Sequence, residues 1–487
     1  MNEAVTKLSP SAVWTHFEQL NAVPRPSKKE ERVIAFMKAF GESLNLETIV
    51  DSAGNVIIRK PATAGYEDRQ GVILQGHLDM VHQKNADTNF DFETQGIQSY
   101  IDDDGWLKAK GTTLGADNGM GVASIMAVLS SDDIEHGPVE ALFTIDEETG
   151  MTGAFELQPG ILTGSILLNT DTEDEGELCI GCAGGVDTNI ELTYPEVPTG
   201  NGSAFNISVT GLRGGHSGCE IHVGRGNANK IMNRLIWNTD TKFGLRISTI
   251  DGGSLRNAIP RESFATVVVN ADQSDAFKQH VATLTGIIQS ELIRTEPDLT
   301  VSLEPAESPV KVMENEHAKR LIQSIYAAPC GVIRWSDEMP NLVETSTSLA
   351  RVQVESGKAI VQFLTRSSVE SARDDLTNMI QATFEMAEAT VEHSGGYPGW
   401  KPNADSEILR RMVRIYKELY GVEPKVNAVH AGLECGIIGS VYTGLDMISV
   451  GPTIKNPHSP DEKCEIASVE KYWNYLVATL KDIPSAG

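Results

Sequence analysis

Short apolar runs alternate with helix-like stretches along the first 170 residues. NVIIRK (55–60), GVILQGH (71–77), VEALFTI (139–145) and SILLNTD (165–171) are nearly uninterrupted, which is typical of strands buried on both faces. GMGVASIMAVLSS (119–131) is long and apolar enough for a buried helix. This alternation predicts an α/β fold whose sheet is mixed, mostly parallel and flanked by helices.

Two further helices are expected near the N-terminus. SPSAVWTHFEQL (9–20) begins with Ser9 as the expected cap and places Pro10 in the first turn. SKKEERVIAFMKAF (27–40) has Ser27 and Glu30 at the spacing of a capping box.

The pattern of predicted strands and helices changes at two segments rich in Gly and Pro. The first lies near residues 186–202 and the second is VEHSGGYPGWKPNADS (391–406). We therefore expect a catalytic domain built from residues 1–187 and 398–487, with an α+β domain, residues 188–397, inserted between the two segments.

The net charge and the composition of the chain argue against some classes of binding partner. The formal net charge is −27, which argues against binding to nucleic acids or to anionic membranes. No run approaches the ~20 apolar residues of a membrane span, and no secretory signal pattern is found. Six cysteines are few for 487 residues, and the CIGC motif (179–182) lacks a second pair. We expect a cytoplasmic protein.

Imidazole and carboxylate groups follow successive strands of the expected sheet. Ligands of open α/β sheets gather outside the carboxyl ends of the strands, so these groups are expected to meet at one edge. One such residue alone is usually structural, but the whole set indicates a site for zinc, manganese or cobalt, in which two ions can act together. The set comprises His77, Asp79, Asp117, Glu147, Glu148, Asp171 and His458.

His77 and Asp79 are two residues apart on an extended segment, so their side chains are expected on the same side. A carboxylate placed in this way fixes the tautomer of a metal-binding imidazole. Asp146, beside the two glutamates, is expected to be structural and to accept hydrogen bonds at the end of its strand.

Five motifs in this order resemble the M20 family of dinuclear zinc peptidases: GHLDMV (76–81), GADNGMG (115–121), TIDEETG (144–150), the strand end at Asp171, and PHSPDE (457–462). The resemblance spans essentially the whole chain. Within the family, the chain is most similar to the aminoacyl-histidine (Xaa-His) dipeptidases in its length, in its large insert and in the motif CAGGVDTNIEL (182–192).

The resemblance implies two divalent metal ions, zinc foremost, with cobalt or manganese as substitutes. It implies that Asp117 bridges the ions and is followed by a cis peptide bond. His77 and Asp171 would complete the ligands of one ion, and Glu148 and His458 those of the other. Asp79 would orient His77, and Glu147 would be the general base and acid.

The resemblance also implies that the inserted domain is a lid that carries dimer contacts and substrate groups. His216 is similar to a lid histidine that reaches the substrate carbonyl, often across a dimer interface. Asn257 and Arg366 resemble residues that hold the terminal carboxylate of the substrate, and the backbone of Gly432 would contact substrate. A homodimer through the lid is therefore expected.

The expected function is hydrolysis of dipeptides, preferentially Xaa-His and including β-alanyl-histidine. An N-acyl amino acid deacylase, or a dipeptidase or tripeptidase of broader specificity, stays open as an alternative, because these substrates share an amide beside a carboxylate. The acidic partner of a dipeptide's free amine would decide between them, and Asp171 or another member of DTEDEGE (171–177) is a candidate. A catalytically inactive binding protein is disfavoured by the intact set of polar residues.

Overall fold

The computed structural model describes residues 2–486, which divide into two compact units. Unit 1 contains the chain up to Gly181, Pro402–Ala428 and the chain from Leu433 onward. Unit 2 contains Cys182–Lys401 and Val429–Gly432. Each unit is described by itself.

Unit 1 is built on an eight-stranded sheet in the order β1-β2-β6-β3-β7-β23-β8-β22. The central pairs β6–β3, β3–β7 and β7–β23 are parallel, whereas β1–β2, β2–β6 and β23–β8 are antiparallel. This confirms the predicted α/β class with a mixed sheet that is parallel at its centre. The strands are β1 Glu47–Val50, β2 Val56–Lys60, β3 Val72–His77, β6 Val139–Thr144, β7 Ile166–Asn169, β8 Glu177–Cys182, β22 Lys425–Val429 and β23 Asp446–Ser449.

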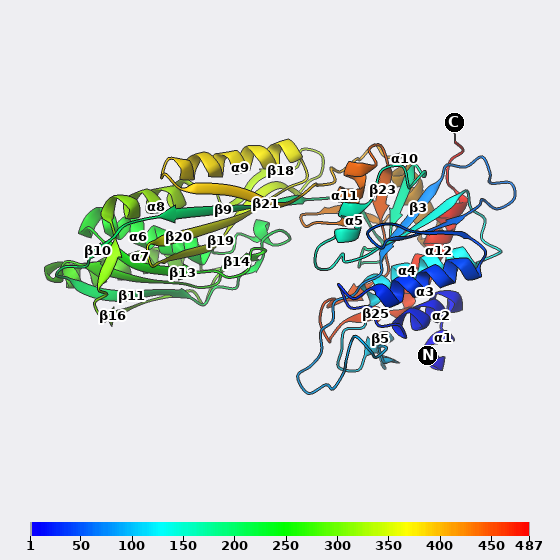
Figure 1. The fold of residues 1–487 in the computed structure, drawn as a ribbon, viewed down its shortest axis with the longest axis horizontal. Helices are drawn as coiled ribbons and strands as arrows, with labels where there is room; N and C mark the ends of the chain where they lie inside the picture. The colour runs from blue at the N-terminus through cyan, green and yellow to red at the C-terminus, as the bar shows by residue number, and fades with distance from the viewer. Residues whose placement is uncertain (1, 487) are drawn as a thin grey trace. The chain divides into compact units, whose positions relative to one another are not determined.

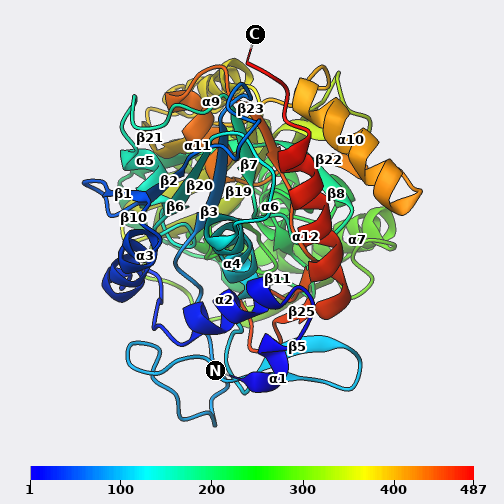
Figure 2. The same ribbon diagram turned by 90° about the vertical axis from the view of Figure 1, so that its right-hand side faces the viewer.

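The central strands are buried because helices pack against the sheet, as Figures 1 and 2 show for α4 and β3. Helix α4, Ala116–Ser130, is buried over almost its whole length and also packs on α2, Ser11–Asn21. A small sheet of β24, β25, β5 and β4 (Ile454–Lys455, Lys463–Glu465, Trp106–Ala109 and Ser99–Ile101) completes the strands of unit 1. Its other helices are α1 Glu3–Thr6, α3 Glu31–Ser43, α5 Thr152–Glu156, α10 Glu407–Tyr420, α11 Glu434–Val441 and α12 Ile466–Lys481.

The two predicted caps at the N-terminal helices are wrong. Helix α2 begins at Ser11, with Pro10 as its N-cap and no side-chain cap bond. Helix α3 has Glu30 as its N-cap, and Ser27 does not form the expected capping box. The Ser27 hydroxyl instead donates to the carboxylate of Asp79 at 2.8 Å, so tertiary contacts override the local capping pattern.

Unit 2 is built on a nine-stranded antiparallel sheet in the order β16-β11-β15-β13-β19-β20-β9-β21, with β18 paired to β19. Helices α6 to α9 pack on this sheet and on one another around a continuous apolar core (Figure 1). The strands are β9 Gly184–Thr193, β11 Ser203–Thr210, β13 Arg246–Gly252, β15 Ser263–Val269, β16 Thr300–Ala306, β18 Gly331–Trp335, β19 Val343–Glu355, β20 Lys358–Ser367 and β21 Thr390–Tyr397.

The remaining elements of unit 2 are helical segments and short strands. The helices are α6 Ala228–Phe243, α7 Ser274–Leu292, α8 Asn315–Ala327 and α9 Glu370–Glu385, with 3-10 turns at Ile221–Val223 and Ala271–Gln273. Two short pairs add β10 Glu196–Pro198 with β17 Lys311–Met313, and β12 Gly215–His216 with β14 Ala258–Ile259. Over residues 2–486, no helix is long and apolar enough to cross a membrane.

Candidate functional site

Three adjacent parallel strands end at one edge of the sheet in unit 1. His77 is the last residue of β3, Glu147 and Glu148 follow β6, and Asp171 follows β7. Because β6, β3 and β7 are neighbours and run in the same direction, the segments that follow them begin at the same edge.

Asp117 lies between the two histidines of this cluster. Its Oδ1 is 3.1 Å from Nε2 of His77, and its Oδ2 is 3.2 Å from Nε2 of His458. The backbone is not helical at Asp117 and Asn118, although both lie in the first turn of α4. The peptide bond between them is cis, as the resemblance implied. One carboxylate thus faces two imidazoles through different oxygens.

A further carboxylate accompanies each histidine. Asp171 Oδ1 is 3.4 Å from Nε2 of His77, and Glu148 Oε2 is 2.9 Å from Nε2 of His458. The ligand atoms of His77, Asp117 and Asp171 lie within 4.8 Å of one another, as do those of Asp117, Glu148 and His458. The two groups share Asp117, so the arrangement suits two divalent cations that one carboxylate bridges.

The hydrogen bonding of the cluster fits this interpretation. Glu148 Oε1 is buried and has no hydrogen-bond partner among the described residues, and an acceptor of this kind is costly unless a cation binds it. Hydrogen bonds that His458 donates to Asp117 and then to Glu148 raise the pKa of His458 to about 11. Burial opposes charge on His77, but Asp171 and Asp117 still hold the pKa of His77 well above its ordinary value. These carboxylates require positive charge, which protons or metal ions can supply.

Asp79 lies behind His77, on its Nδ1 side. Its Oδ1 is 3.4 Å from Nδ1 of His77, and the same ring nitrogen is 3.2 Å from the backbone carbonyl of Asp79. The carboxylate also accepts the N–H groups of Glu147, at 3.0 Å, and Glu148, at 3.3 Å. One aspartate therefore connects the segment that follows β3 to the segment that follows β6.

The three adjacent acids after β6 have different surroundings. Ligand atoms of Glu147 and Glu148 group with those of His77, and burial raises the pKa of Glu147 well above its ordinary value. Asp146 accepts hydrogen bonds from the hydroxyls of Thr149 and Thr152 and a 3.3 Å contact from Lys28. Asp146 therefore accepts hydrogen bonds at the end of its strand, as expected.

Glu462 is a structural residue of the site that sequence reasoning missed. Its carboxylate accepts four backbone N–H groups, those of residues 114, 115, 116 and 117, at 2.7–3.2 Å. It therefore fixes the loop that carries Asp117. Burial, followed by the charge of Asp117, raises the pKa of Glu462 to about 7. Glu462 ends the PHSPDE motif, but this position does not indicate that its partners are the backbone N–H groups of residues 114–117.

Two other carboxylates lie near the cluster, of which Glu434 is buried and Glu173 is half-buried. Glu434 accepts hydrogen bonds from Gln75, at 2.6 Å, and Thr144, at 2.7 Å, while its Oε1 has no partner within residues 2–486. Burial, followed by the charges of Asp117 and Asp171, raises the pKa of Glu173 to about 8. Unit 1 thus concentrates acidic groups around its candidate metal centre.

Whereas unit 1 gathers acidic side chains, unit 2 contains a buried basic side chain, Arg366. This side chain is only 4% exposed, and its Nε has no hydrogen-bond acceptor in the described chain. Nη1 donates to the hydroxyl of Tyr397 at 2.8 Å. Among residues 2–486, no carboxylate lies within ion-pairing distance of Arg366. A buried guanidinium without a counter-ion is a candidate site for an anionic ligand group.

His216 lies beside Arg366. A Cβ built on Gly218 would lie 3.0 Å from both Arg366 Nε and His216 Cε1, so the two side chains adjoin the same small space. Nδ1 of His216 accepts the N–H groups of Gly218 and Cys219, and burial, followed by the charge of Arg366, lowers the pKa of His216. The neutral ring therefore carries its proton on Nε2, where it can be donated.

The other two predicted substrate residues of unit 2 are Asn257 and Gly432. Asn257 is exposed, and its backbone carbonyl accepts the N–H of Ser217 at 2.8 Å. Gly432 belongs to the short segment Val429–Gly432. Two residues before it, Nε2 of His430 lies 2.7 Å from the hydroxyl oxygen of Ser346, within hydrogen-bond distance.

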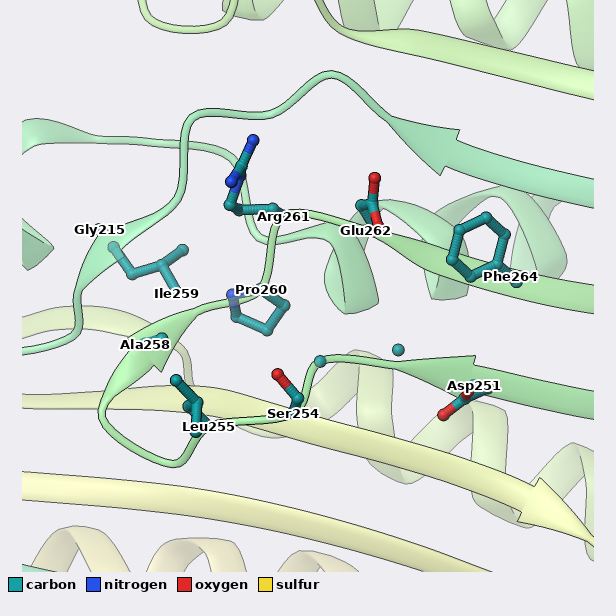
Figure 3. Close-up of a pocket in the computed structure, with 12 residues that line it drawn as sticks. Gly215, Asp251, Ser254, Leu255, Ala258, Ile259, Pro260, Arg261, Glu262 and Phe264 are labelled. Carbon is teal, nitrogen blue, oxygen red and sulfur yellow. The ribbon is translucent and has the colours of Figure 1, made fainter. Parts of the chain in front are cut away.

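A cavity of about 510 Å³ lies along the antiparallel pair of β12 and β14, and His216 is on β12 (Figure 3). It is lined by backbone at Gly252 and Gly253 and by the side chains of Leu255, Arg261 and Phe264. None of the predicted metal or substrate residues lines it.

Comparisons with known proteins agree with this arrangement. The model of peptidase family M20/M25/M40 matches residues 73–482. The chain is 43% identical to the cytosol non-specific dipeptidase of Escherichia coli K12, with 99% of each chain covered. It matches the crystal structure of aminoacylhistidine dipeptidase from Vibrio alginolyticus with a TM-score of 0.94 at 45% identity, covering 99% of both chains. Aminopeptidase PepT from Bacillus cereus, at 16% identity over 98% of this chain and 99% of that one, shares the fold with a TM-score of 0.58. The chain therefore belongs to peptidase family M20/M25/M40.

Proposed function

We propose that this protein is a cytoplasmic, metal-dependent dipeptidase that prefers Xaa-His substrates, including β-alanyl-histidine. The observation that supports it most is the pair of ligand groups that share Asp117. The relatives at 43% and 45% identity are named as dipeptidases, one of them for aminoacylhistidine substrates.

The metal ligands fall into two sets in this proposal. His77 and Asp171 would hold one ion, Glu148 and His458 would hold the other, and Asp117 would be shared by both sets. Zinc is the expected native ion, since imidazole and carboxylate ligands suit it. When bound, the ions polarise the scissile carbonyl and make a water molecule more acidic.

Glu147 is proposed as the residue that moves the proton. It takes a proton from the attacking water and delivers that proton to the nitrogen of the leaving amine. Asp79 keeps His77 in position through its ring nitrogen and holds the backbone of Glu147 at 3.0 Å. Asp79 thus connects the proton-transferring residue, Glu147, to the proposed metal ligand His77.

Unit 2 is proposed to recognise the substrate as a lid. Arg366 binds the terminal carboxylate through paired hydrogen bonds, and the Nε2 proton of His216 is donated to the substrate carbonyl. Asn257 and the backbone of Gly432 are further proposed contacts. We also propose that the protein is a homodimer formed through this unit.

The test is a substrate panel at defined metal content. Chelation should abolish hydrolysis of leucyl-histidine and carnosine, and zinc, cobalt or manganese added singly should restore it. N-acetyl amino acids should be cleaved at least 100-fold more slowly, because they lack the free amine. Preferential cleavage of N-acetyl substrates would identify a deacylase, and hydrolysis that persists without metal would refute the proposed metal dependence.

A further inference from the structure

Four residues form a row across neighbouring strands of the unit 2 sheet. In the register of β19, β20, β9 and β21, Ser346 pairs with Arg366, Arg366 with Gly185, and Gly185 with Tyr397. Residues directly opposite one another on paired strands lie on the same face of the sheet. Arg366 and Tyr397 are therefore separated only by a glycine on the strand between them.

The glycine at position 185 allows the tyrosine ring to reach the arginine. A Cβ on Gly185 would lie 2.6 Å from both Cζ and the hydroxyl oxygen of Tyr397, a distance that side chains do not tolerate. The backbone carbonyl of Tyr397 accepts a hydrogen bond from Nη1 of Arg373 on α9, at 3.0 Å. The ring of Tyr397 thus lies directly over Gly185, and a hydrogen bond from α9 holds the backbone of Tyr397.

Tyr397 is the one protein acceptor found for the guanidinium of Arg366 in residues 2–486. Nη1 donates to its hydroxyl at 2.8 Å, whereas Nε is buried without an acceptor. A guanidinium offers five N–H donors in a rigid plane, so fixing one edge fixes the directions of all the others. Within the described chain, the tyrosine hydroxyl has no acceptor for its own proton.

We propose that Tyr397 is a positioning residue that orients Arg366 toward the free C-terminal carboxylate of the substrate. The proposal rests on the proposed dipeptidase function and adds the group that sets specificity for a terminal carboxylate. The hydroxyl accepts one N–H of Arg366, leaves the remaining donors for the carboxylate, and directs its own proton to the same anion. Gly185 is required because it leaves room for the ring.

The experiment compares Tyr397→Phe with the wild type on two substrates, leucyl-histidine and its C-terminal amide. Phe keeps the ring over Gly185 but removes the acceptor for Arg366. We expect kcat/KM for the free acid to fall about 10- to 100-fold, mostly through KM, because one hydrogen bond to a charged group is lost. The amide presents no carboxylate, so its kcat/KM should change less than about twofold.

A control variant and two further variants test the role of Tyr397. Tyr194→Phe removes another tyrosine hydroxyl of unit 2, one that is buried without a partner, and should leave both substrates unaffected. Gly185→Ala should reproduce the selective loss on the acid by displacing the ring. In an Arg366→Lys background, which lacks the planar fork, Tyr397→Phe should cost clearly less than in the wild type.

The results separate this inference from the function on which it rests. If Tyr397→Phe slows the acid and the amide equally, or leaves the acid unchanged, the positioning role is refuted while the dipeptidase function stands. If the wild-type enzyme cleaves neither substrate under any metal loading, the proposed function fails, and the role of Tyr397 fails with it.

Discussion

The polar clusters of the two units carry opposite, uncompensated charge. In unit 1, four carboxylates group with two histidines, and Glu148 keeps a buried oxygen without a partner among the described residues. In unit 2, the buried guanidinium of Arg366 has no carboxylate partner in the described chain. Buried charge without a counter-charge lowers stability, so clusters of both kinds indicate ligands that supply what is missing. One cluster is suited to cations and the other to an anion.

A second comparison lies between two buried arginines. Arg25 in unit 1 is 1% exposed and donates to the backbone carbonyls of Leu78, Asp79 and Gly115. Arg366 in unit 2 is buried to a similar extent but bonds only to Tyr397 among the described residues. Burial alone therefore does not distinguish a structural arginine from a ligand-binding one, whereas the number of acceptors does.

The largest effect is expected from Glu147→Gln. The variant keeps the shape of the side chain but cannot accept a proton, so kcat for dipeptides should fall about 10³- to 10⁴-fold. Metal content, measured by atomic emission, should stay at the wild-type value, because none of the proposed metal ligands is changed. Glu156→Gln, an exposed glutamate on α5, is the control and should have normal kcat. Near-normal turnover of Glu147→Gln would remove Glu147 from the mechanism.

The two arginines should respond in opposite ways to replacement by Met. Arg25→Met leaves several buried carbonyls without donors and should lower the free energy of unfolding by about 3–5 kcal/mol. Arg366→Met removes an uncompensated buried charge, so its stability should be unchanged or higher, while kcat/KM for dipeptides falls at least 100-fold. Urea unfolding and steady-state kinetics on both variants test the contrast. A large loss of stability in Arg366→Met would contradict it.

The sequence located the acidic cluster better than the basic one. His77, the two glutamates and Asp171 lie at the ends of three neighbouring parallel strands, so one topological rule brings them together. Arg366 and Tyr397 become neighbours only through the register of β20, β9 and β21, which no local pattern specifies. Glu462 could not be assigned either, because its partners are backbone N–H groups about 350 positions away.

Local signals failed where tertiary contacts compete with them. Ser27 has the residue type and spacing of a capping box, but its hydroxyl bonds to Asp79. The apolar periods of the buried strands and of α4 predicted those elements correctly, because burial determines their sequence directly.

The stability of unit 2 should depend on pH through His430. Burial, followed by the charges of Arg366 and His216, lowers the pKa of His430 from 6.5 to about 3. Between these values the unfolded chain binds a proton that the folded chain does not, so stability falls as pH falls below 6.5. At pH 5.0 this proton binding should lower the free energy of unfolding by about 2 kcal/mol relative to pH 7.5.

His430→Asn tests this dependence by removing the titrating group. Urea unfolding at pH 5.0 and 7.5 should show a smaller difference in the variant than in the wild type, by about 2 kcal/mol. His393→Asn, an exposed histidine on β21, is the control and should keep the wild-type difference. If His430→Asn keeps that difference as well, the buried imidazole is not the source of the pH dependence.

The smallest expected effect is a null result from mixing inactive subunits. His216 and Arg366 belong to the same unit and adjoin one space, so both should serve the same catalytic centre, whichever subunit of the proposed dimer contains it. Co-refolding His216→Ala chains with Arg366→Ala chains should therefore restore no activity, because each centre receives one defective unit 2. Recovery toward about a quarter of the wild-type rate would show that the two residues serve different centres.

A second mixture determines which subunit's centre is served. Glu147→Gln chains have an intact unit 2, and Arg366→Ala chains have an intact metal cluster. If unit 2 acts on the cluster of its own chain, a mixed dimer contains no complete centre and stays inactive. If it acts on the partner's cluster, one centre of each mixed dimer is complete, and about a quarter of the activity returns. Together the two mixtures establish whether the cation-binding and anion-binding clusters that act on one substrate belong to one chain or to two.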